Sequence, residues 1–136
     1  MTSTDQFTWP FDVRDYECDL QGIVNNAVYQ QYLEHARHQF LKQHGFSFAE
    51  LTKAGINLVV VRAELDYQAP LRSGETFVVG LRLERLSPVR FVFAQEITRR
   101  SPAPHTILTA RITCAAMNAA GKPIIPTVLK SLFESP

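Results

Sequence analysis

Residues 19–37 read DLQGIVNNAVYQQYLEHAR and decide the fold, because they join a polar turn to a long amphipathic segment. Apolar side chains recur there at spacings of three, four and seven residues, which predicts one buried face of an α-helix. This face carries Val28, Tyr29, Tyr32, Leu33, Ala36 and Phe40. Asp19 lies a few residues before the predicted helix start. The first N–H groups of a helix have no partner within it and can hold an oxyanion, so we expect any chemistry at this junction.

A second, shorter helix is predicted directly after the long one, which runs to about residue 43. Ser47 and Glu50 have the spacing of a capping box, in which each satisfies a free N–H of the first helical turn. Leu51 and Ala54 are predicted to face inward from this helix. Both helices therefore come before most of the strands.

The rest of the chain alternates apolar and polar residues with the period of two that predicts strands. One strand is predicted before the long helix, at residues 7–13, and Pro10 favours an edge position for it because proline cannot donate to the ladder. Four longer strands follow at about 56–67, 76–84, 89–98 and 106–117, with a polar loop over 99–104.

The short connections between these strands favour antiparallel neighbours. We therefore predict an α+β fold in which a five-stranded antiparallel sheet wraps around one long helix, as a single domain over residues 1–136. Such a sheet leaves long strand edges, which proteins normally pair or cover. The sequence therefore favours a homodimer.

Composition and charge limit the classes of partner. The chain has 14 basic and 13 acidic side chains, a net charge of +1, so nothing points to nucleic acid or a membrane surface. No stretch approaches the roughly 20 apolar residues of a membrane span, and the first residues lack the apolar run of a signal peptide. Cys18 and Cys114 lie outside any metal-ligand spacing. We expect a cytoplasmic protein with reduced cysteines, no metal and no cofactor.

Two blocks of sequence resemble one known family over nearly the whole chain. The first block consists of Asp19, Gly22, Val24, Asn25, Asn26, Tyr29 and Glu34, and the second is NLVVVRAELDYQAPLRSGETF at residues 57–77. Together they resemble the hotdog-fold 4-hydroxybenzoyl-CoA thioesterase family, particularly its bacterial acyl-CoA thioesterase branch. The resemblance implies the hotdog fold and hydrolysis of acyl thioesters of coenzyme A or acyl carrier protein.

The resemblance also implies roles for particular residues. The carboxylate of Asp19 attacks the thioester carbonyl or activates water, and the backbone N–H of Asn26 stabilises the oxyanion. The acyl group lies between the long helix and the strand at 58–67, across a dimer interface. Residues expected to contact substrate are Gly22, Val24, Asn25, Tyr29, Val60 and Arg62, of which the last two are predicted to share one face of their strand.

Coenzyme A would bring phosphates, and arginines at strand ends are the candidates to bind them. These are Arg85, Arg90, Arg99 and Arg100. An ordinary charged rim is the alternative interpretation of each.

Several of these residues also have purely structural interpretations. Asp19, Asn25 and Asn26 are of the types that form turns and helix N-caps. Tyr29 suits the core or an interface, and Glu34 has helical spacing to Arg37 or His38 for an ion pair.

Two other functions remain open from the sequence. A non-catalytic acyl-thioester-binding module would keep the fold and the dimer without turnover. A dehydratase or hydratase of acyl thioesters needs a catalytic histidine near the helix, and none occurs in residues 20–34. Three questions stay undecided from the sequence. They are the length or aromatic character of the acyl group, the choice between dimer and tetramer, and whether Asp19 acts as nucleophile or as general base.

Overall fold

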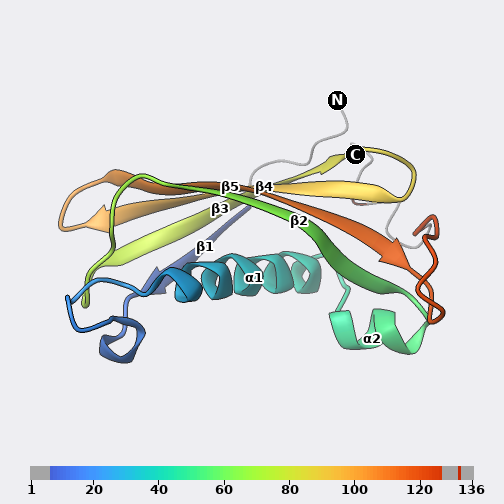
Figure 1. Ribbon diagram of the computed structural model, residues 1–136, viewed down its shortest axis with the longest axis horizontal. Coiled ribbons are helices and arrows are strands. Elements are labelled where there is room, and N and C mark those ends of the chain that lie inside the picture. The colour runs from blue at the N-terminus through green and yellow to red at the C-terminus, as the bar shows by residue number, and fades with distance from the viewer. Residues whose placement is uncertain (1–6, 127–131, 133–136) are drawn as a thin grey trace.

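A five-stranded sheet lies across one long helix in the computed structural model, which describes residues 7–126 and 132 (Figure 1). In chain order the elements are β1 (Phe7–Asp12), the 3-10 helix η1 (Asp15–Glu17), α1 (Asn26–Gln43), α2 (Phe48–Lys53), β2 (Asn57–Tyr67), β3 (Thr76–Arg85), β4 (Arg90–Ser101) and β5 (His105–Met117). The predicted order of elements is confirmed.

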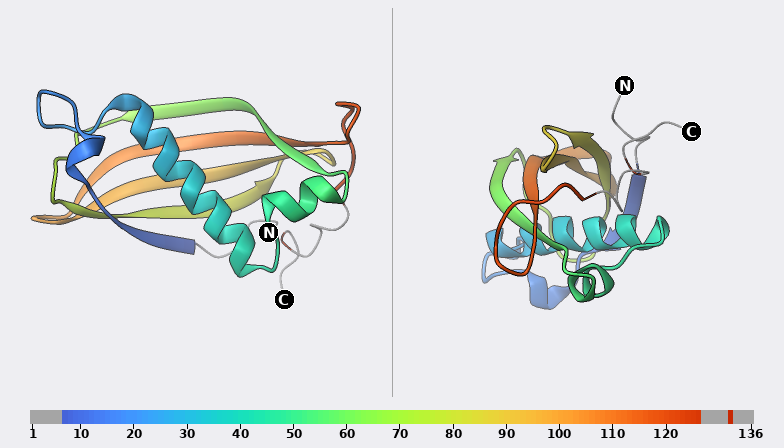
Figure 2. Two further views of the ribbon diagram at one scale, coloured as in Figure 1. Left: turned by 90° about the horizontal axis from the view of Figure 1, so that it is seen from below. Right: turned by 90° about the vertical axis from the view of Figure 1, so that its right-hand side faces the viewer.

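The sheet is antiparallel throughout, with strand order β1-β3-β4-β5-β2. Helix α1 runs beneath one face of the sheet, and α2 lies beyond its C-terminal end (Figures 1 and 2). The first and second strands of the sequence are therefore its two edges. Pro10 lies in the edge strand β1, as predicted.

Helix α1 follows the predicted pattern of burial. Its stripe at helical spacing faces the sheet, with Leu33 and Ala36 fully buried and Phe40 1% exposed. At the N-terminus Asn25 is the N-cap, because its side chain accepts a hydrogen bond from the N–H of Ala27 at 3.0 Å. Just after the C-cap, Gly45 has a φ of +87°, which glycine adopts without steric cost.

Alternate residues of the central strands form the other wall of the core. In β3 these are Phe77, Val79, Leu81 and Leu83, each no more than 1% exposed. In β5 they are Leu108, Ala110, Ile112, Cys114 and Ala116. Burial of one large apolar side chain contributes about 1.5–3 kcal/mol, so this interlocking of helix and sheet dominates the stability.

Two predicted details at element ends are wrong. Ala54 is exposed, since it is the C-cap of α2 and lies beyond the last turn that packs inward, whereas Leu51 is buried. Strand β4 continues to Ser101, where it pairs with Thr76 of β3, so the first half of the predicted loop over 99–104 is strand.

A β-bulge in β2 corrects a third prediction. Val60 pairs with Cys114 and Arg62 pairs with Thr113, so Val61 is an extra residue without its own partner in β5. Val60 therefore faces α1 and Arg62 faces away from it, rather than both sharing one face. Arg62 forms an exposed ion pair with Glu64 at 3.3 Å on that outer face.

Candidate active site

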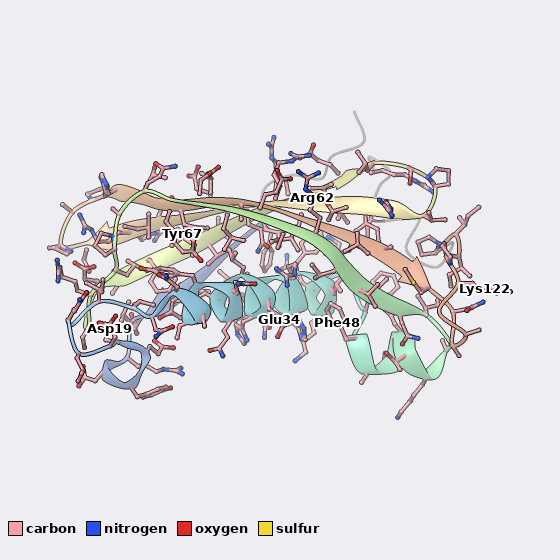
Figure 3. All side chains as sticks on the ribbon, viewed as in Figure 1. Asp19, Glu34, Phe48, Arg62, Tyr67 and Lys122 are labelled. Atoms are coloured by element: carbon pink, nitrogen blue, oxygen red, sulfur yellow. The ribbon has the colours of Figure 1, made fainter. Side chains whose placement is uncertain are left out.

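A tight turn before α1 carries Asp19. Cys18 and Val24 form an antiparallel bridge across it, and the Asp19 N–H donates to the carbonyl of Ile23 at 2.9 Å. The N–H of Gly22 donates to the Asp19 carbonyl at 3.0 Å, and Gly22 has a φ of +80°. The backbone therefore fixes where the Asp19 side chain begins, just before the helix (Figure 3).

The Asp19 carboxylate is exposed and accepts one local hydrogen bond. Its Oδ1 accepts from the N–H of Gln21 at 2.8 Å, which is the turn-forming contact that the structural interpretation expects. Within the described part of the chain, Oδ2 accepts no hydrogen bond. One carboxylate oxygen therefore holds the turn while the other stays available.

The start of α1 presents an unused donor next to this turn. The Asn25 side chain satisfies the N–H of Ala27, and the Asn25 carbonyl accepts from Val28 at 2.9 Å. The N–H of Asn26 donates to no residue in the stretch that the structure describes. Because it carries the positive end of the helix dipole, it can stabilise negative charge on a bound oxygen.

A cleft of about 370 Å³ opens beside Asn26. Tyr67, at the end of the edge strand β2, reaches across it and donates its hydroxyl to the Asn26 carbonyl at 3.4 Å. The cleft is lined by Ile23, Val24, Asn26, Tyr29, Tyr67, Gln68, Ala69 and Pro70. Helix start, turn and strand end thus meet around one small space.

Tyr29 and Val24 anchor the turn to the rest of the fold. The Tyr29 hydroxyl accepts from the N–H of Leu71 at 3.0 Å, and the N–H of Val24 donates to the Leu71 carbonyl at 2.9 Å. Tyr29 is only 3% exposed, and burial raises the pKa of its hydroxyl. Tyr29 therefore supports the site as a neutral core residue, the alternative that the sequence favoured.

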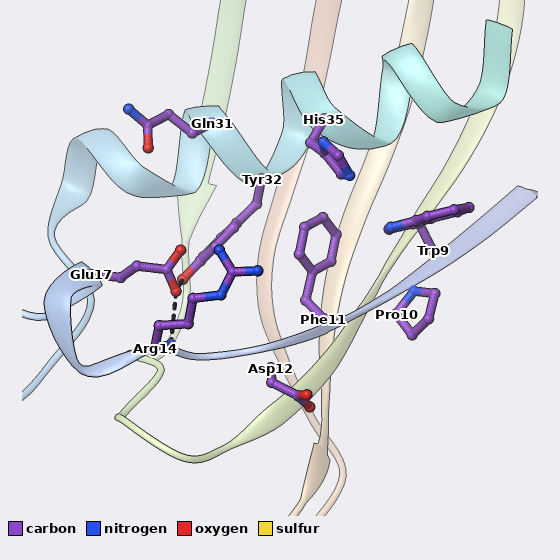
Figure 4. A pocket seen from close by; sticks show the side chains of 9 residues that line it. All are labelled: Trp9, Pro10, Phe11, Asp12, Arg14, Glu17, Gln31, Tyr32 and His35. Carbon is purple, nitrogen blue, oxygen red and sulfur yellow. Dashed lines mark hydrogen bonds between the residues drawn. The ribbon is translucent and has the colours of Figure 1, made fainter. Parts of the chain in front are cut away.

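A larger cavity, of about 500 Å³, lies on the other side of α1 against β1 (Figure 4). Phe11 and Trp9 form its aromatic wall with His35, and Tyr32 donates its hydroxyl to Oε1 of Glu17 at 2.8 Å. Burial and this hydrogen bond raise the pKa of Tyr32. Asn26 does not line this cavity, and Asp19 lines neither this cavity nor the cleft beside Asn26, so size alone does not identify the reactive site.

The four candidate arginines do not form one site. Arg85 and Arg90 flank the turn between β3 and β4, while Arg99 and Arg100 lie near the other end of β4. At about 3.3 Å per residue, the two ends are roughly 30 Å apart. The Arg85 guanidinium donates to the carbonyls of Ser87 and Pro88, and Arg99 donates to Ala103 and pairs with Glu75 at 3.5 Å.

Arg72 is a basic residue that the sequence analysis missed. It bridges Ile23 of the turn, so it lies at the same end of the molecule as Asp19. The signal was available, because Arg72 belongs to the second block of resemblance, but only the long-range bridge shows its proximity to the turn.

The predicted ion pair of Glu34 is wrong. The ion pairs between residues 7–126 are Arg62–Glu64, Arg99–Glu75 and Arg111–Glu84. Glu34 is exposed, whereas Arg37 turns inward and donates to Gln95 of β4 at 3.0 Å. Tertiary packing therefore overrides the helical spacing of Glu34 and Arg37.

The family profile described as Thioesterase-like superfamily matches residues 13–133. The chain belongs to this superfamily. The match covers the turn, α1 and the whole of β2 to β5, so all the elements that form the cleft belong to the shared domain.

Two curated relatives illustrate the range of the superfamily. The chain is 38% identical over 122 residues to the acyl-acyl carrier protein thioesterase ATL2 of Arabidopsis thaliana, covering 89% of this chain and 64% of that protein. It is 29% identical over 106 residues to the acyl-CoA thioester hydrolase YbgC of Escherichia coli, covering 78% of this chain and 77% of that protein. The chain thus spans less than two thirds of the plant relative.

Solved structures confirm the hotdog thioesterase fold. A hypothetical protein from Aquifex aeolicus superposes with a TM-score of 0.86 at 29% identity, covering 94% of this chain and 99% of that one. The 1,4-dihydroxy-2-naphthoyl-CoA thioesterase from Synechocystis gives 0.87 at 22% identity, covering 94% and 95%. At the latter identity the likeness concerns the fold alone.

Two other classes of feature were sought in the described residues. No group of three or more His, Cys, Asp or Glu side chains there is placed to hold a metal ion. None of the helices found there has the length and apolar character needed to cross a membrane.

Proposed function

We propose that the chain hydrolyses acyl thioesters at the junction of the turn and α1. Asp19 acts on the thioester carbonyl, as nucleophile or as general base for water, and the N–H of Asn26 stabilises the oxyanion. The observation that carries the proposal is an available carboxylate oxygen on Asp19 with an unused helix N–H beside a cleft, in a member of the thioesterase-like superfamily.

The chemistry of a thioester suits so sparse a site. Addition of water or the carboxylate to the carbonyl carbon places negative charge on its oxygen, where a preorganised N–H is worth several kcal/mol. Collapse expels the carrier as a thiolate, which needs little protonation near neutral pH because thiol pKa values are about 8.5. In the nucleophilic route water then hydrolyses the acyl–Asp19 anhydride and restores the carboxylate.

The carriers proposed are coenzyme A and acyl carrier protein, the two that relatives name. Arg72 and Arg100 lie at the same end of the sheet as the Asp19 turn, and both are exposed. We assign phosphate binding to this end rather than to Arg85 and Arg90. The remaining candidate, Arg99, is already engaged by Glu75.

We also propose that two copies associate through β2. This edge strand exposes Val59, Val60, Val61 and Tyr67, with 36% to 50% of each side chain accessible. An edge of this length is normally paired, and pairing about a twofold axis would place the second copy beside the cleft. A tetramer would need a further surface. Free cysteines in the described chain fit a cytoplasmic setting.

The test is thiol release from a panel of acyl-CoA and acyl carrier protein thioesters by the parent and Asp19→Asn. We expect Asp19→Asn to lower kcat/KM at least 100-fold, the low end of the usual contribution of an acid–base group. Folding and association should not change, because the amide can still accept from the N–H of Gln21.

The matched control is Asp12→Asn, in the larger cavity beside β1. It should retain parental activity. Equal activity of Asp19→Asn and the parent would refute the mechanism, and loss of activity in Asp12→Asn alone would move the chemistry to the other cavity. A parent that binds thioesters without releasing thiol would favour the non-catalytic module, and hydration of enoyl thioesters would favour the hydratase.

A further inference from the structure

Arg37 is a buried cation without a counter-ion in the described residues. Only 7% of its surface is exposed, and no ion pair in the structure includes it. Its Nη1 donates to Oε1 of Gln95 at 3.0 Å, a neutral acceptor. Burying a charge with so little compensation costs free energy, and here burial lowers the pKa of Arg37. The folded chain therefore maintains an unfavourable arrangement at this point.

Gln95 cannot supply more acceptors to the guanidinium. Its Nε2 donates to the Leu33 carbonyl at 3.0 Å, which fixes the amide with its single oxygen toward Arg37. A guanidinium has five N–H donors and no acceptor. No fully buried side-chain N or O atom in the described chain lacks a partner, so the remaining Arg37 donors are those that still reach solvent.

These donors reach solvent through a narrow cleft of about 200 Å³ between α1 and β2. Half of its lining residues are apolar, namely Leu33, Val60, Ala63 and Ile112, and the polar half consists of Gln30, Gln31, Glu34 and Arg37. Glu34 is exposed and offsets part of the positive charge from a distance. Among the described residues, none of these other polar side chains accepts a hydrogen bond from Arg37.

This narrow cleft and the one beside Asn26 share no lining residue, but α1 and β2 contribute to the walls of both. At one end Asn26 faces Tyr67, and at the other Arg37 faces Val60, so α1 and β2 run side by side in opposite directions. Arg37 lies three turns after Asn26, roughly 16 Å along the axis at 1.5 Å per residue. Helical side chains point back toward the N-terminus, which brings the guanidinium nearer to the reacting carbonyl.

We propose that Arg37 binds an oxygen acceptor on the distal part of the acyl group and so selects oxygenated acyl thioesters. The inference rests on the proposed function and names its substrate class. The acceptor is a hydroxyl, oxo or carboxylate oxygen separated from the thioester by a chain of roughly ten carbons, given C–C bonds of about 1.5 Å. The apolar side chains of the cleft contact the acyl chain, and the N–H groups of Arg37 donate hydrogen bonds to the oxygen at its end.

The experiment compares dodecanoyl-CoA, 12-hydroxydodecanoyl-CoA and the mono-CoA thioester of dodecanedioic acid. In the parent, kcat/KM for at least one oxygenated substrate should exceed that for dodecanoyl-CoA by about tenfold or more, since sites built to hydrogen-bond a group discriminate against its absence. In Arg37→Met that ratio should fall to within about twofold of unity. Lys42→Met, which removes an exposed cation from the same helix, should keep the parental ratio.

Calorimetric binding of the free acids separates this inference from the proposed function. Dodecanedioate or 12-hydroxydodecanoate binding the parent more tightly than dodecanoate, with the difference lost in Arg37→Met, supports the Arg37 site even if no thioester is hydrolysed. Hydrolysis without any preference for oxygen retains the proposed function and overturns the inference. If the parent shows no oxygen preference and Arg37→Met self-associates more weakly than the parent, the partner of Arg37 would be a second copy of the chain instead of a ligand. If Arg37→Met fails to fold, the double variant Arg37→Met/Gln95→Leu takes its place, because it also removes the Gln95 oxygen that would lose its donor. If that variant fails as well, the ratio of kcat/KM between oxygenated and plain substrates in the parent decides.

Discussion

The two sides of α1 differ in how far the chain completes them. On the β1 side, the rings of Phe11 and Tyr32 contact each other with centroids 5.3 Å apart, and Glu17 accepts the Tyr32 hydroxyl. On the β2 side, an 11-residue strand is mostly exposed and Arg37 has only a neutral partner in the described chain. On the β1 side the buried hydroxyl of Tyr32 has a carboxylate partner, whereas on the β2 side we propose that a second copy covers the exposed strand and that a ligand oxygen binds Arg37.

The difference begins in the sequence of the two edge strands. β1 has six residues and contains Pro10, which cannot donate to a further strand. β2 is nearly twice as long and carries three consecutive valines. A proline shields one edge from pairing, and β-branched residues favour pairing at the other.

The largest expected effect is loss of self-association when a charge is placed on the β2 edge. Val59→Glu, on the face of β2 that points away from α1, would bring like charges together between two copies, which costs several kcal/mol, so we expect the dimer Kd to rise by roughly 100-fold or more. Sedimentation velocity measures the change. Thr8→Glu, at an exposed position of β1, is the control and should associate like the parent. A monomeric parent, or dissociation by Thr8→Glu alone, would contradict the assignment of the interface to β2.

Tyr32→Phe sharpens the contrast from the β1 side. It removes the hydrogen bond to Glu17, so we expect the free energy of unfolding to fall by about 1–3 kcal/mol with hydrolysis unchanged. Urea titration and thiol release measure the two quantities. Tyr16→Phe, at a 76% exposed ring, should change neither. A large loss of activity in Tyr32→Phe would show that chemistry extends to the β1 side.

Gly22→Ala tests whether the turn belongs functionally to the β2 side. At a φ of +80° alanine costs about 1 kcal/mol, although the space for its Cβ is open. Because this turn positions Asp19, activity should fall as well. Gly121→Ala has nearly the same φ in the turn after β5 and should cost similar stability without loss of activity. Equal activities of the two variants would argue against a precise role for the turn.

The smallest expected effect is a pH dependence where α2 closes the far end of α1. His38 stacks on Phe48 with centroids 4.1 Å apart, and burial lowers the pKa of His38 below its usual 6.5. As the pH falls, His38 takes up its proton in the unfolded chain before it does so in the folded chain. The contribution of neutral His38 to the free energy of unfolding is therefore complete above pH 6.5, and it is lost as the pH falls through the folded-state pKa. His38→Gln should flatten the decline of the urea midpoint between pH 7 and 5. An unchanged slope would remove His38 as its source.

The fold was predictable because each segment keeps one period. The 3.6-residue spacing of apolar side chains runs along α1, apolar residues recur at every second position from Phe77 to Leu83 and from Leu108 to Ala116, and Pro10 marks an edge. The bulge in β2 was not predictable, because residues 58–61 are all apolar and fit either register. Only pairing with β5 decides which valine faces α1.

The site residues also fall into a predictable and an unpredictable group. Asp19, Asn25 and Asn26 are close in sequence, so local spacing alone located the turn and the helix start. The environment of Arg37 depends on Gln95, which lies on another element, and local spacing suggested a pair with Glu34 instead. Residues brought together only by tertiary contacts lay beyond the reach of the sequence.

The bulge at Val61 also makes β2 tolerant of losing one residue at this position. The extra residue sets the two halves of the strand out of phase, so that Val60 and Ala63 both line the narrow cleft. Deletion of this single residue would leave Val60 opposite Cys114 and Arg62 opposite Thr113, so strict alternation would return with Val60 still facing α1. Loss of the bulge residue would therefore change the local twist and bend of this edge strand, while the lining of the narrow cleft and the rest of the sheet stay as they are.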